Sequence, residues 1–318
     1  MRKEGLKARL FEALVKELVK KAGFREFDSE ELTRRKKFHG RGATHQIDVW
    51  GEFYFSIPFI YPVNLLGEVK AYKGQVGLGP VRDFCGVCKD ISEVYKIDTT
   101  SGGVDRYSRV GQARHTHCPA FFSLNGFSKN AEEYMFAQGI NPITYENNST
   151  ILKIYKKFSG LINTIAYKKL TKADYKYFKK LELLPLINES AKKKNFAEKY
   201  KKLTKHLESI NSYFGMLSGK FVINILTKKD IGKLQKLSKC TIDYSKNFLI
   251  KHKNRLLGEF SLSKQFIKYY LVDKENIRKT FAHTNIFLSD SSQGRVIRLE
   301  FTPESVDELA NKLLSNKT

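Results

Sequence analysis

Three residues in the first half of the chain combine side chains that phosphodiester hydrolysis requires. Glu68 and Lys70 lie two positions apart in the apolar run LLGEVKAY (65–72), and Asp48 lies in QIDVWGEFYF (46–55). Side chains two apart in a strand share a face, so we expect Glu68 and Lys70 to project together and Asp48 to meet them from a neighbouring strand. Charges in such apolar surroundings cost free energy unless they serve a site.

Two carboxylates and a lysine at one end of a sheet suit phosphodiester hydrolysis. The carboxylates would hold Mg²⁺, for which Mn²⁺ can substitute, and the metal would polarise the phosphoryl oxygen and lower the pKa of the attacking water. Lys70 would orient that water or offset the charge that builds on the phosphate. A Glu-x-Lys pair is also typical of the solvated face of a strand, so these residues alone leave both interpretations open.

The surrounding residues predict the elements that would position this cluster. Apolar residues recur at helical spacing over 4–22, and Gly23 follows as a C-terminal stop. Helices are expected over 80–95 and 128–138, and strands over 46–55, 65–72, 119–124 and 140–144. This order predicts one α/β domain over residues 1–148, with a mixed sheet flanked by helices.

Four segments in this order resemble the PD-(D/E)xK nuclease superfamily, and within it the Mrr-like restriction endonucleases. They are FEALVKELVKKAGF, GATHQIDV, GEVKAY and AFFSLNGFSKNAEEYMFAQGI, and together they cover roughly residues 8–147. The resemblance implies a restriction-endonuclease-like fold, with Asp48 and Glu68 as metal ligands. It also implies that Lys70 is the catalytic lysine and that Glu12 is an accessory metal ligand.

Glu12 has two open interpretations. At about 100° per residue it falls on one flank of the apolar stripe of the first helix, beside Val19, from which a carboxylate can reach a site at the sheet edge. Alternatively, Glu12 faces solvent and pairs with Lys16 at i,i+4, a contact that stabilises a helix by only a few tenths of a kcal/mol.

Two residues that flank Asp48 are possible accessory groups. Gln46 shares its strand face and His45 precedes it, so either side chain could touch the scissile phosphate or a water. For His45 we favour the alternative, a loop histidine with a local hydrogen bond. Ile47 and Gln46 depart from the residues that the superfamily and its Mrr-like subgroup often show there, but neither change removes a metal ligand.

Cys85 and Cys88, together with His115 and Cys118, offer thiolates and an imidazole for a structural zinc site. The two cysteines of the CxxC pair fall, however, on the apolar face of the predicted helix 80–95, where a free cysteine behaves as a small hydrophobic residue. We therefore favour a packing role over zinc.

The charge of the chain is concentrated in its second half. The 318 residues include 57 Lys and Arg against 33 Asp and Glu, a formal net charge of +24. Residues 1–150 carry 22 basic and 18 acidic residues, whereas the remainder carries 35 and 15. An excess of this size predicts a polyanionic partner, because each lysine or arginine that contacts a phosphate releases a bound counterion. Nucleic acid, and DNA in particular, is the expected partner.

The second half, residues 149–318, is predicted to be a basic C-terminal domain for DNA binding or target selection. Its pattern is helical over 151–210 and mixed α/β over 211–318, with a last helix over 303–314. Apolar runs that resemble strands occupy 219–226, 248–253, 258–263, 266–272, 284–289 and 294–301. The region as a whole therefore predicts an α+β arrangement.

Basic residues beside aromatic residues fit a surface that follows a phosphate backbone. Candidate DNA contacts are Lys156 and Lys176 in the second half and Arg82 and Arg114 in the first. Lysine runs on amphipathic helices are also often only a solvated face, so that interpretation stays open.

The sequence as a whole predicts a metal-dependent DNA endonuclease, with restriction or defence against foreign DNA as its setting. A double-strand cut needs two active sites, so a homodimer is expected. Four cysteines and no apolar run of about 18 residues predict a cytoplasmic protein without a membrane span. Two alternatives remain: a non-catalytic nucleic-acid-binding module, and a nuclease that acts on RNA or single-stranded DNA.

Overall fold

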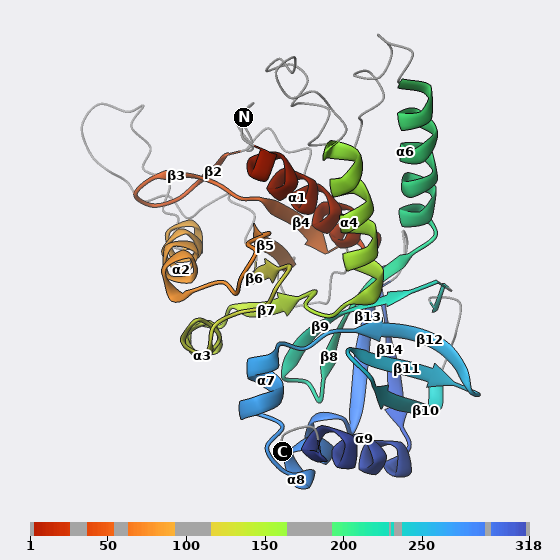
Figure 1. Cartoon of the computed structure of the whole chain (residues 1–318). Helices are drawn as coiled ribbons and strands as arrows, with labels where there is room; N and C mark the ends of the chain where they lie inside the picture. Colours follow the sequence, from red (N-terminus) through yellow and green to blue (C-terminus); the bar gives the residue numbers. More distant parts are fainter. Residues whose placement is uncertain are drawn as a thin grey trace.

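The computed structural model describes residues 3–25, 37–53, 63–92, 116–163, 193–228, 230–231, 237–289 and 294–315. It has an α/β fold in which sheets are flanked by helices. In Figure 1 the sheet and the helices that cover it form the upper part of the molecule and a β-barrel forms the lower part, and β7 contacts β9 where the two parts join.

The five-stranded sheet carries the first part of the chain. Its strands follow the order β1 (Phe24–Arg25), β4 (Val49–Phe53), β5 (Val63–Lys70), β6 (Thr116–Ser123) and β7 (Asn141–Thr144). β4 runs antiparallel to β5, whereas β5, β6 and β7 run parallel. The predicted mixed sheet is confirmed, and the carboxyl ends of its three parallel strands meet at one edge.

Helices cover both faces of this sheet. α1 (Lys3–Lys21) packs on the face that carries Leu65 and Val69, and these residues share one buried cluster with the apolar stripe of α1. α2 (Leu78–Ser92) and α3 (Lys129–Ala137) cover the opposite face. The apolar periodicity of residues 4–22 and 80–95 therefore predicts the buried sides of α1 and α2 correctly.

The predicted strand 46–55 is interrupted at Asp48. Its first residues belong to a separate hairpin of two short strands, β2 (Lys37–His39) and β3 (Thr44–Gln46). Backbone pairing between β4 and β5 stops at Val49, opposite Gly67. Beyond that pair, the Asp48 carboxylate accepts the Val69 amide, so a side chain replaces a backbone carbonyl at the end of the ladder.

Two helices from the second half extend the cluster of α1, since α4 (Ser149–Asn163) packs against α1 and α6 (Lys193–Glu208) packs against α4. Both bury apolar side chains in the same cluster as α1, namely Ile151, Ile154, Phe158, Leu161, Leu203 and Leu207. They agree with the helical pattern predicted over 151–210, of which 164–192 lie outside the described residues. One hydrophobic cluster thus extends across residue 148, and the division predicted there stays a prediction.

A closed barrel follows α6. Its strands are β8 (Asn211–Leu217), β9 (Phe221–Thr227), β10 (Leu237–Tyr244), β11 (Phe248–His252), β12 (Arg255–Phe260), β13 (His283–Ser289) and β14 (Gly294–Phe301), in the order β10-β11-β12-β9-β8-β13-β14. β14 closes the barrel by pairing in parallel with β10. α9 (Pro303–Ser315) packs against the barrel with Val306, Leu309 and Leu313 buried, which confirms the predicted last helix.

The strand predicted over 266–272 is wrong. This segment begins within α7 (Lys264–Tyr269), and α8 (Lys274–Thr280) follows it. Ser263 is the N-cap of α7, because its hydroxyl accepts the Phe266 amide at 2.9 Å. The cap satisfies the Phe266 amide, which in a strand would instead donate to a neighbouring strand. It therefore favours a helix that begins after Ser263.

Buried polar contacts join the barrel to the rest of the chain. Glu259 of β12 accepts hydrogen bonds from the Ser149 hydroxyl and the Thr150 amide, each at 3.1 Å, at the start of α4. Tyr145, which follows β7, donates to Asn224 of β9 at 3.0 Å. A carboxylate at a helix N-terminus satisfies unpaired amides, so Glu259 fixes α4 to the barrel.

Candidate active site

The structure brings Asp48, Glu68 and Lys70 together at one edge of the sheet. The Lys70 ammonium forms an ion pair with Glu68, and its Nζ lies 3.8 Å from Oδ2 of Asp48. The three side chains are 21%, 20% and 25% exposed, respectively. The cluster is therefore partly buried but still open to a substrate.

Alternation along β5 gives Glu68 and Lys70 their common side. Val69 between them is buried against the α1 side, whereas Leu66 is buried on the opposite, α2 side. Residues two apart share a face, so Glu68 and Lys70 project on the side of Leu66 at the carboxyl end of the strand. The spacing Glu-x-Lys in this apolar run predicts that arrangement correctly.

Asp48 enters the cluster from the break between β3 and β4. Its Oδ2 accepts the Val69 amide at 3.0 Å. Because Val69 lies between the other two charged residues, this hydrogen bond holds Asp48 in register with both of them.

The cluster disfavours negative charge on Glu68. Burial and, after it, the charge of Asp48 raise the pKa of Glu68 to about 7, against the opposing effect of Lys70. Near neutral pH, Glu68 is therefore poised between its protonated and ionised forms. A cation placed between the two carboxylates would favour the ionised form.

Lys70 remains an ammonium group. Burial alone would lower its pKa, but the charges of Glu68 and Asp48 outweigh burial, so the pKa of Lys70 is raised. A lysine with a raised pKa is not a proton acceptor at neutral pH. It can instead stabilise negative charge on a substrate.

α1 brings a third carboxylate into electrostatic range. The charge of Glu12 makes the smallest contribution to the raised pKa of Glu68, so Glu12 lies within electrostatic range of the cluster. One turn further along, Lys16 Nζ lies 4.4 Å from the centre of the Trp50 ring. The role of Glu12 as an accessory metal ligand stays a prediction.

The donor set suits a hard cation that keeps much of its water. Within the described ranges, no group of three or more His, Cys, Asp or Glu side chains is arranged to hold a metal. Asp48 and Glu68 nevertheless offer two carboxylates whose mutual repulsion raises a pKa. Mg²⁺ is usually bound through one or two carboxylates and retains several waters, so this pair fits Mg²⁺ better than a metal that needs a closed protein cage.

His45 takes part in a different contact. Its Nε2 lies 2.6 Å from Oδ2 of Asp90 on α2, while the Asp90 carboxylate accepts the amides of Gly42 and Ala43 at 2.8 and 3.1 Å. His45 therefore has a hydrogen bond, as in the interpretation that we favoured, but its partner is distant in the sequence rather than local, and His45 lies on β3 rather than in a loop. Asp90 therefore ties the β2–β3 hairpin, which leads into Asp48, to α2.

The role of Asp90 in holding the hairpin could not be predicted from the sequence, because an aspartate near the end of a helix is usually an exposed residue without a special role. No motif links it to the glycine-rich segment 40–46, from which it is separated by more than forty positions. Gln46, the other accessory candidate, is exposed on β3, and its contact with a substrate stays a prediction.

The predicted DNA contacts are scattered over the described surface. Arg82 is exposed on α2, with its guanidinium 5.8 Å from the Tyr134 ring. Lys156 is exposed on α4. Arg114 and Lys176 lie outside the described residues.

The CxxC pair lies on the buried face of α2, as its periodicity predicts. Cys85 and Cys88 are 4% and 7% exposed within the cluster that includes Phe84. Burial, with a contribution from Cys85, raises the pKa of Cys88 to about 12, which disfavours the thiolate that a metal requires. Cys118 is on β6, and His115 lies outside the described residues.

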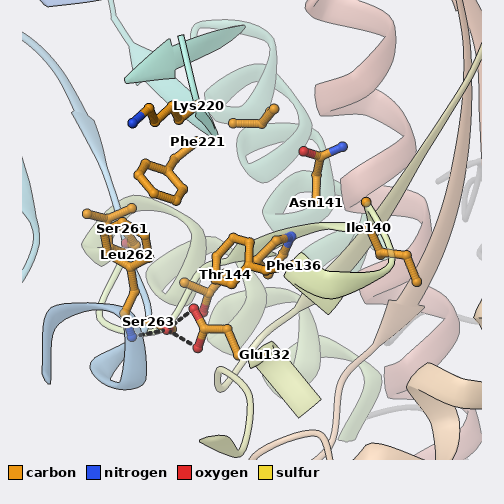
Figure 2. Close-up of a pocket in the computed structure, with 14 residues that line it drawn as sticks. Glu132, Phe136, Ile140, Asn141, Thr144, Lys220, Phe221, Ser261, Leu262 and Ser263 are labelled. Carbon is orange, nitrogen blue, oxygen red and sulfur yellow. Dashed lines mark hydrogen bonds between the residues drawn. The ribbon is translucent and has the colours of Figure 1, made fainter. Parts of the chain in front are cut away.

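A pocket of about 140 Å³ lies between α3, β7, β9 and the residues before α7, and none of the three site residues lines it (Figure 2). Glu132 stands in its wall and accepts a hydrogen bond from the Ser263 hydroxyl at 2.7 Å. Burial raises the pKa of Glu132 to about 7, against the effect of that hydrogen bond and with a small addition from Glu146. This contact joins α3 to the N-cap of α7.

No helix in the described ranges combines the length and the apolar character that a membrane crossing requires.

No protein-family model matches the chain, and no curated protein matches it. Among solved structures, the crystal structure of a protein described as "Protein of Unknown Function AF1548" aligns at 14% identity over 63% of this chain and 98% of its own. The TM-score is 0.36, so this likeness carries no argument about fold or activity.

Proposed function

We propose that this protein is a metal-dependent DNA endonuclease of the PD-(D/E)xK type. The observation that carries the proposal is the meeting of Asp48, Glu68 and Lys70 at the carboxyl end of β5. Two carboxylates with a lysine held between them, in a partly open site, are the groups that phosphodiester hydrolysis needs.

Each residue has a definite task in this reaction. Asp48 and Glu68, with Glu12 as a further donor, would hold Mg²⁺ or Mn²⁺. The bound ion would supply Lewis-acid polarisation of the phosphoryl oxygen and a lowered pKa of water. Lys70, with its raised pKa, offsets the charge that develops on the phosphate in the transition state.

The charge of the chain supports a nucleic-acid substrate. The formal net charge is +24, and residues 151–318 carry most of the excess. Such a surface binds a phosphate backbone through counterion release. We further propose duplex DNA as the substrate, a homodimer that cuts both strands, and restriction or defence against foreign DNA as the setting.

Plasmid cleavage in Mg²⁺ or Mn²⁺ tests the assignment. Asp48→Ala and Lys70→Ala should each lower the cleavage rate by about 100-fold or more, the usual effect of losing one preorganised charge. Asp83→Ala and Lys73→Ala are matched controls, because both side chains are exposed and outside the cluster. Cleavage that survives Asp48→Ala and Lys70→Ala would refute the site.

Substrate comparison separates the alternatives. Duplex DNA, single-stranded DNA and RNA of one sequence are digested side by side. Preferential cleavage of RNA or single-stranded DNA would keep the site and change the substrate. Metal-independent binding without cleavage of any of the three would instead indicate a non-catalytic module.

A further inference from the structure

Lysines gather where α4, α6 and the end of β9 meet. Lys153 and Lys157 lie one turn apart on α4, Lys228 follows β9, and all three side chains are exposed. Burial lowers the pKa of His206 on α6, and the charges of Lys157, Lys153 and Lys228 lower it further. Electrostatic influence of this kind is short-ranged, so lysines from two separate segments lie near one imidazole.

Further lysines extend this group into a surface. α4 and α6 lie side by side, as Figure 1 shows, and both bury their apolar side chains in the cluster that includes α1. Their exposed faces carry lysines at helical spacing. We define the α4–α6 lysine surface by its exposed lysines, Lys153, Lys156, Lys157, Lys202, Lys205 and Lys228.

Within the described residues, no lysine of this surface forms an ion pair with a carboxylate. Other lysines of the chain do, since Lys251 and Lys312 pair with Asp243, and Lys264 pairs with Glu146. Among the residues that the structure describes, carboxylates therefore pair with lysines of the barrel region and α7 but not with the six lysines of this surface. Like charges held this close repel one another, and a bound polyanion would relieve the repulsion.

The residue types indicate which anion fits. The surface contains lysines and no arginine, and lysine acts as a point charge without the planar fork that grips one phosphate from two sides. Its charges are spread over two helices and a strand end. This arrangement suits successive phosphates along a backbone, and it carries no means of reading base sequence.

Direct contacts join the end of α6, which carries part of this surface, to α1. Lys21 at the end of α1 donates to the carbonyls of Leu207, Glu208 and Ile210, at 2.7, 3.0 and 2.7 Å. These are the last carbonyls of α6 and of the turn that follows it. The same α1 carries Glu12, whose charge acts on Glu68, so α1 contacts α6 and also lies within electrostatic range of the candidate active site.

We propose that the α4–α6 lysine surface binds the sugar-phosphate backbone of duplex DNA. It holds the duplex without regard to sequence while the Asp48–Glu68–Lys70 cluster acts on one of its phosphates. The last step rests on the proposed nuclease function, whereas binding itself does not depend on cleavage.

The test measures binding of a labelled duplex in EDTA, where no metal-dependent cleavage occurs. The variant Lys153→Gln/Lys157→Gln/Lys228→Gln should bind about 10- to 100-fold more weakly at low salt. The slope of log affinity against log salt concentration should also decrease in magnitude by about 2 to 3, because each lost phosphate contact lowers it by about 0.9. Lys153→Arg/Lys157→Arg/Lys228→Arg should restore both values.

A matched control removes the same charge elsewhere. Lys246→Gln/Lys253→Gln/Lys274→Gln changes three exposed lysines of the barrel region. Equal weakening by both triple variants would overturn the proposal, because it would reflect net charge alone. Thermal unfolding of each variant confirms that it is folded before binding is compared.

A local readout is the titration of His206, followed by NMR. Phosphates at this surface would raise the pKa of His206 when duplex DNA is added, and an unchanged titration in saturated complex would overturn the proposal. If the protein binds DNA as predicted but cuts nothing in Mg²⁺ or Mn²⁺, the nuclease function fails and the binding surface stands.

Discussion

Asp48 Oδ2 accepts the backbone amide of Val69 at 3.0 Å, and the same oxygen lies 3.8 Å from Lys70 Nζ. Val69 is the residue between Glu68 and Lys70. The hydrogen bond therefore locks one acidic group to the strand that carries the other two charged groups. Substitutions of Asp48 can therefore separate the effect of its charge from the effect of its hydrogen bond to Val69.

Asp48→Asn retains an acceptor for the Val69 amide but removes the charge, whereas Asp48→Ala removes both. Both variants should lose cleavage by about 100-fold or more. The free energy of unfolding should fall by about 1–2 kcal/mol in Asp48→Ala and by a smaller amount in Asp48→Asn, as measured in urea. Substantial cleavage by Asp48→Asn would show that the charge is not required.

Metal binding should depend on pH through Glu68. A protonated carboxyl group is a poor ligand, so a metal must displace the proton that Glu68 holds below its pKa of about 7. Mg²⁺ affinity should rise with pH up to about 7 and then level off. Calorimetry in buffers of different ionisation enthalpy should detect proton release below that pH. Glu68→Gln should abolish this release, and pH-independent affinity in the native chain would contradict the assignment.

Asp90 should act by positioning the hairpin that precedes Asp48. The His45 hydrogen bond, followed by the Gly42 amide, lowers the pKa of Asp90, so the ionised carboxylate is the form that holds the hairpin. Asp90→Ala should accelerate hydrogen exchange at Gly42 and Ala43 and lower cleavage by about 10-fold, less than the loss in Asp48→Ala. Asp83→Ala on the same helix is the control. Unchanged exchange would indicate that the hairpin is held by other contacts.

Glu132 should make stability depend on pH. Its pKa is raised from 4.5 to about 7 in the folded chain, so folding favours the protonated form. The stability of the native chain relative to Glu132→Gln should therefore be greatest below about pH 4.5. It should fall as pH rises to about 7, by on the order of 3 kcal/mol, and stay constant above that. Parallel pH profiles for the two proteins would contradict this.

Glu259 should be among the residues that hold the barrel to α4. Glu259→Ala leaves the Thr150 amide and the Ser149 hydroxyl without their buried acceptor, and should lower the free energy of unfolding by about 2–4 kcal/mol. Glu275→Ala removes an ion pair in which Glu275 is 75% exposed, and should change stability by less than about 1 kcal/mol. Similar losses in both variants would argue against this anchor.

The sequence predicts the parts of this structure that depend on local periodicity. α1, α2 and α3 and strands β5, β6 and β7 lie within a few residues of their predicted positions, because each has an apolar stripe or run bounded by turn signals. The side-by-side placement of Glu68 and Lys70 follows from strand alternation alone. Asp48 meets them because β4 pairs with β5.

Features that depend on contacts between distant residues could not be predicted. The break before β4 exists because a side chain accepts the Val69 amide, and the hairpin is held by Asp90, many residues later. The run 266–272 fits a strand as well as a helix until the Ser263 cap is known. Glu132 is likewise buried by residues far along the chain, such as Ser263, so the sequence around it does not mark it as a buried carboxylate.

The hydrophobic cluster that α1 shares with α4 and α6 has a consequence for how this protein can be divided or recombined. Ile151, Ile154 and Phe158 are fully buried, although they follow the predicted boundary at residue 148. A chain cut at that point would present the apolar stripe of α1 to water and would tend to aggregate. A chain recombined near this point should therefore fold only when α4 and α6 stay with the sheet.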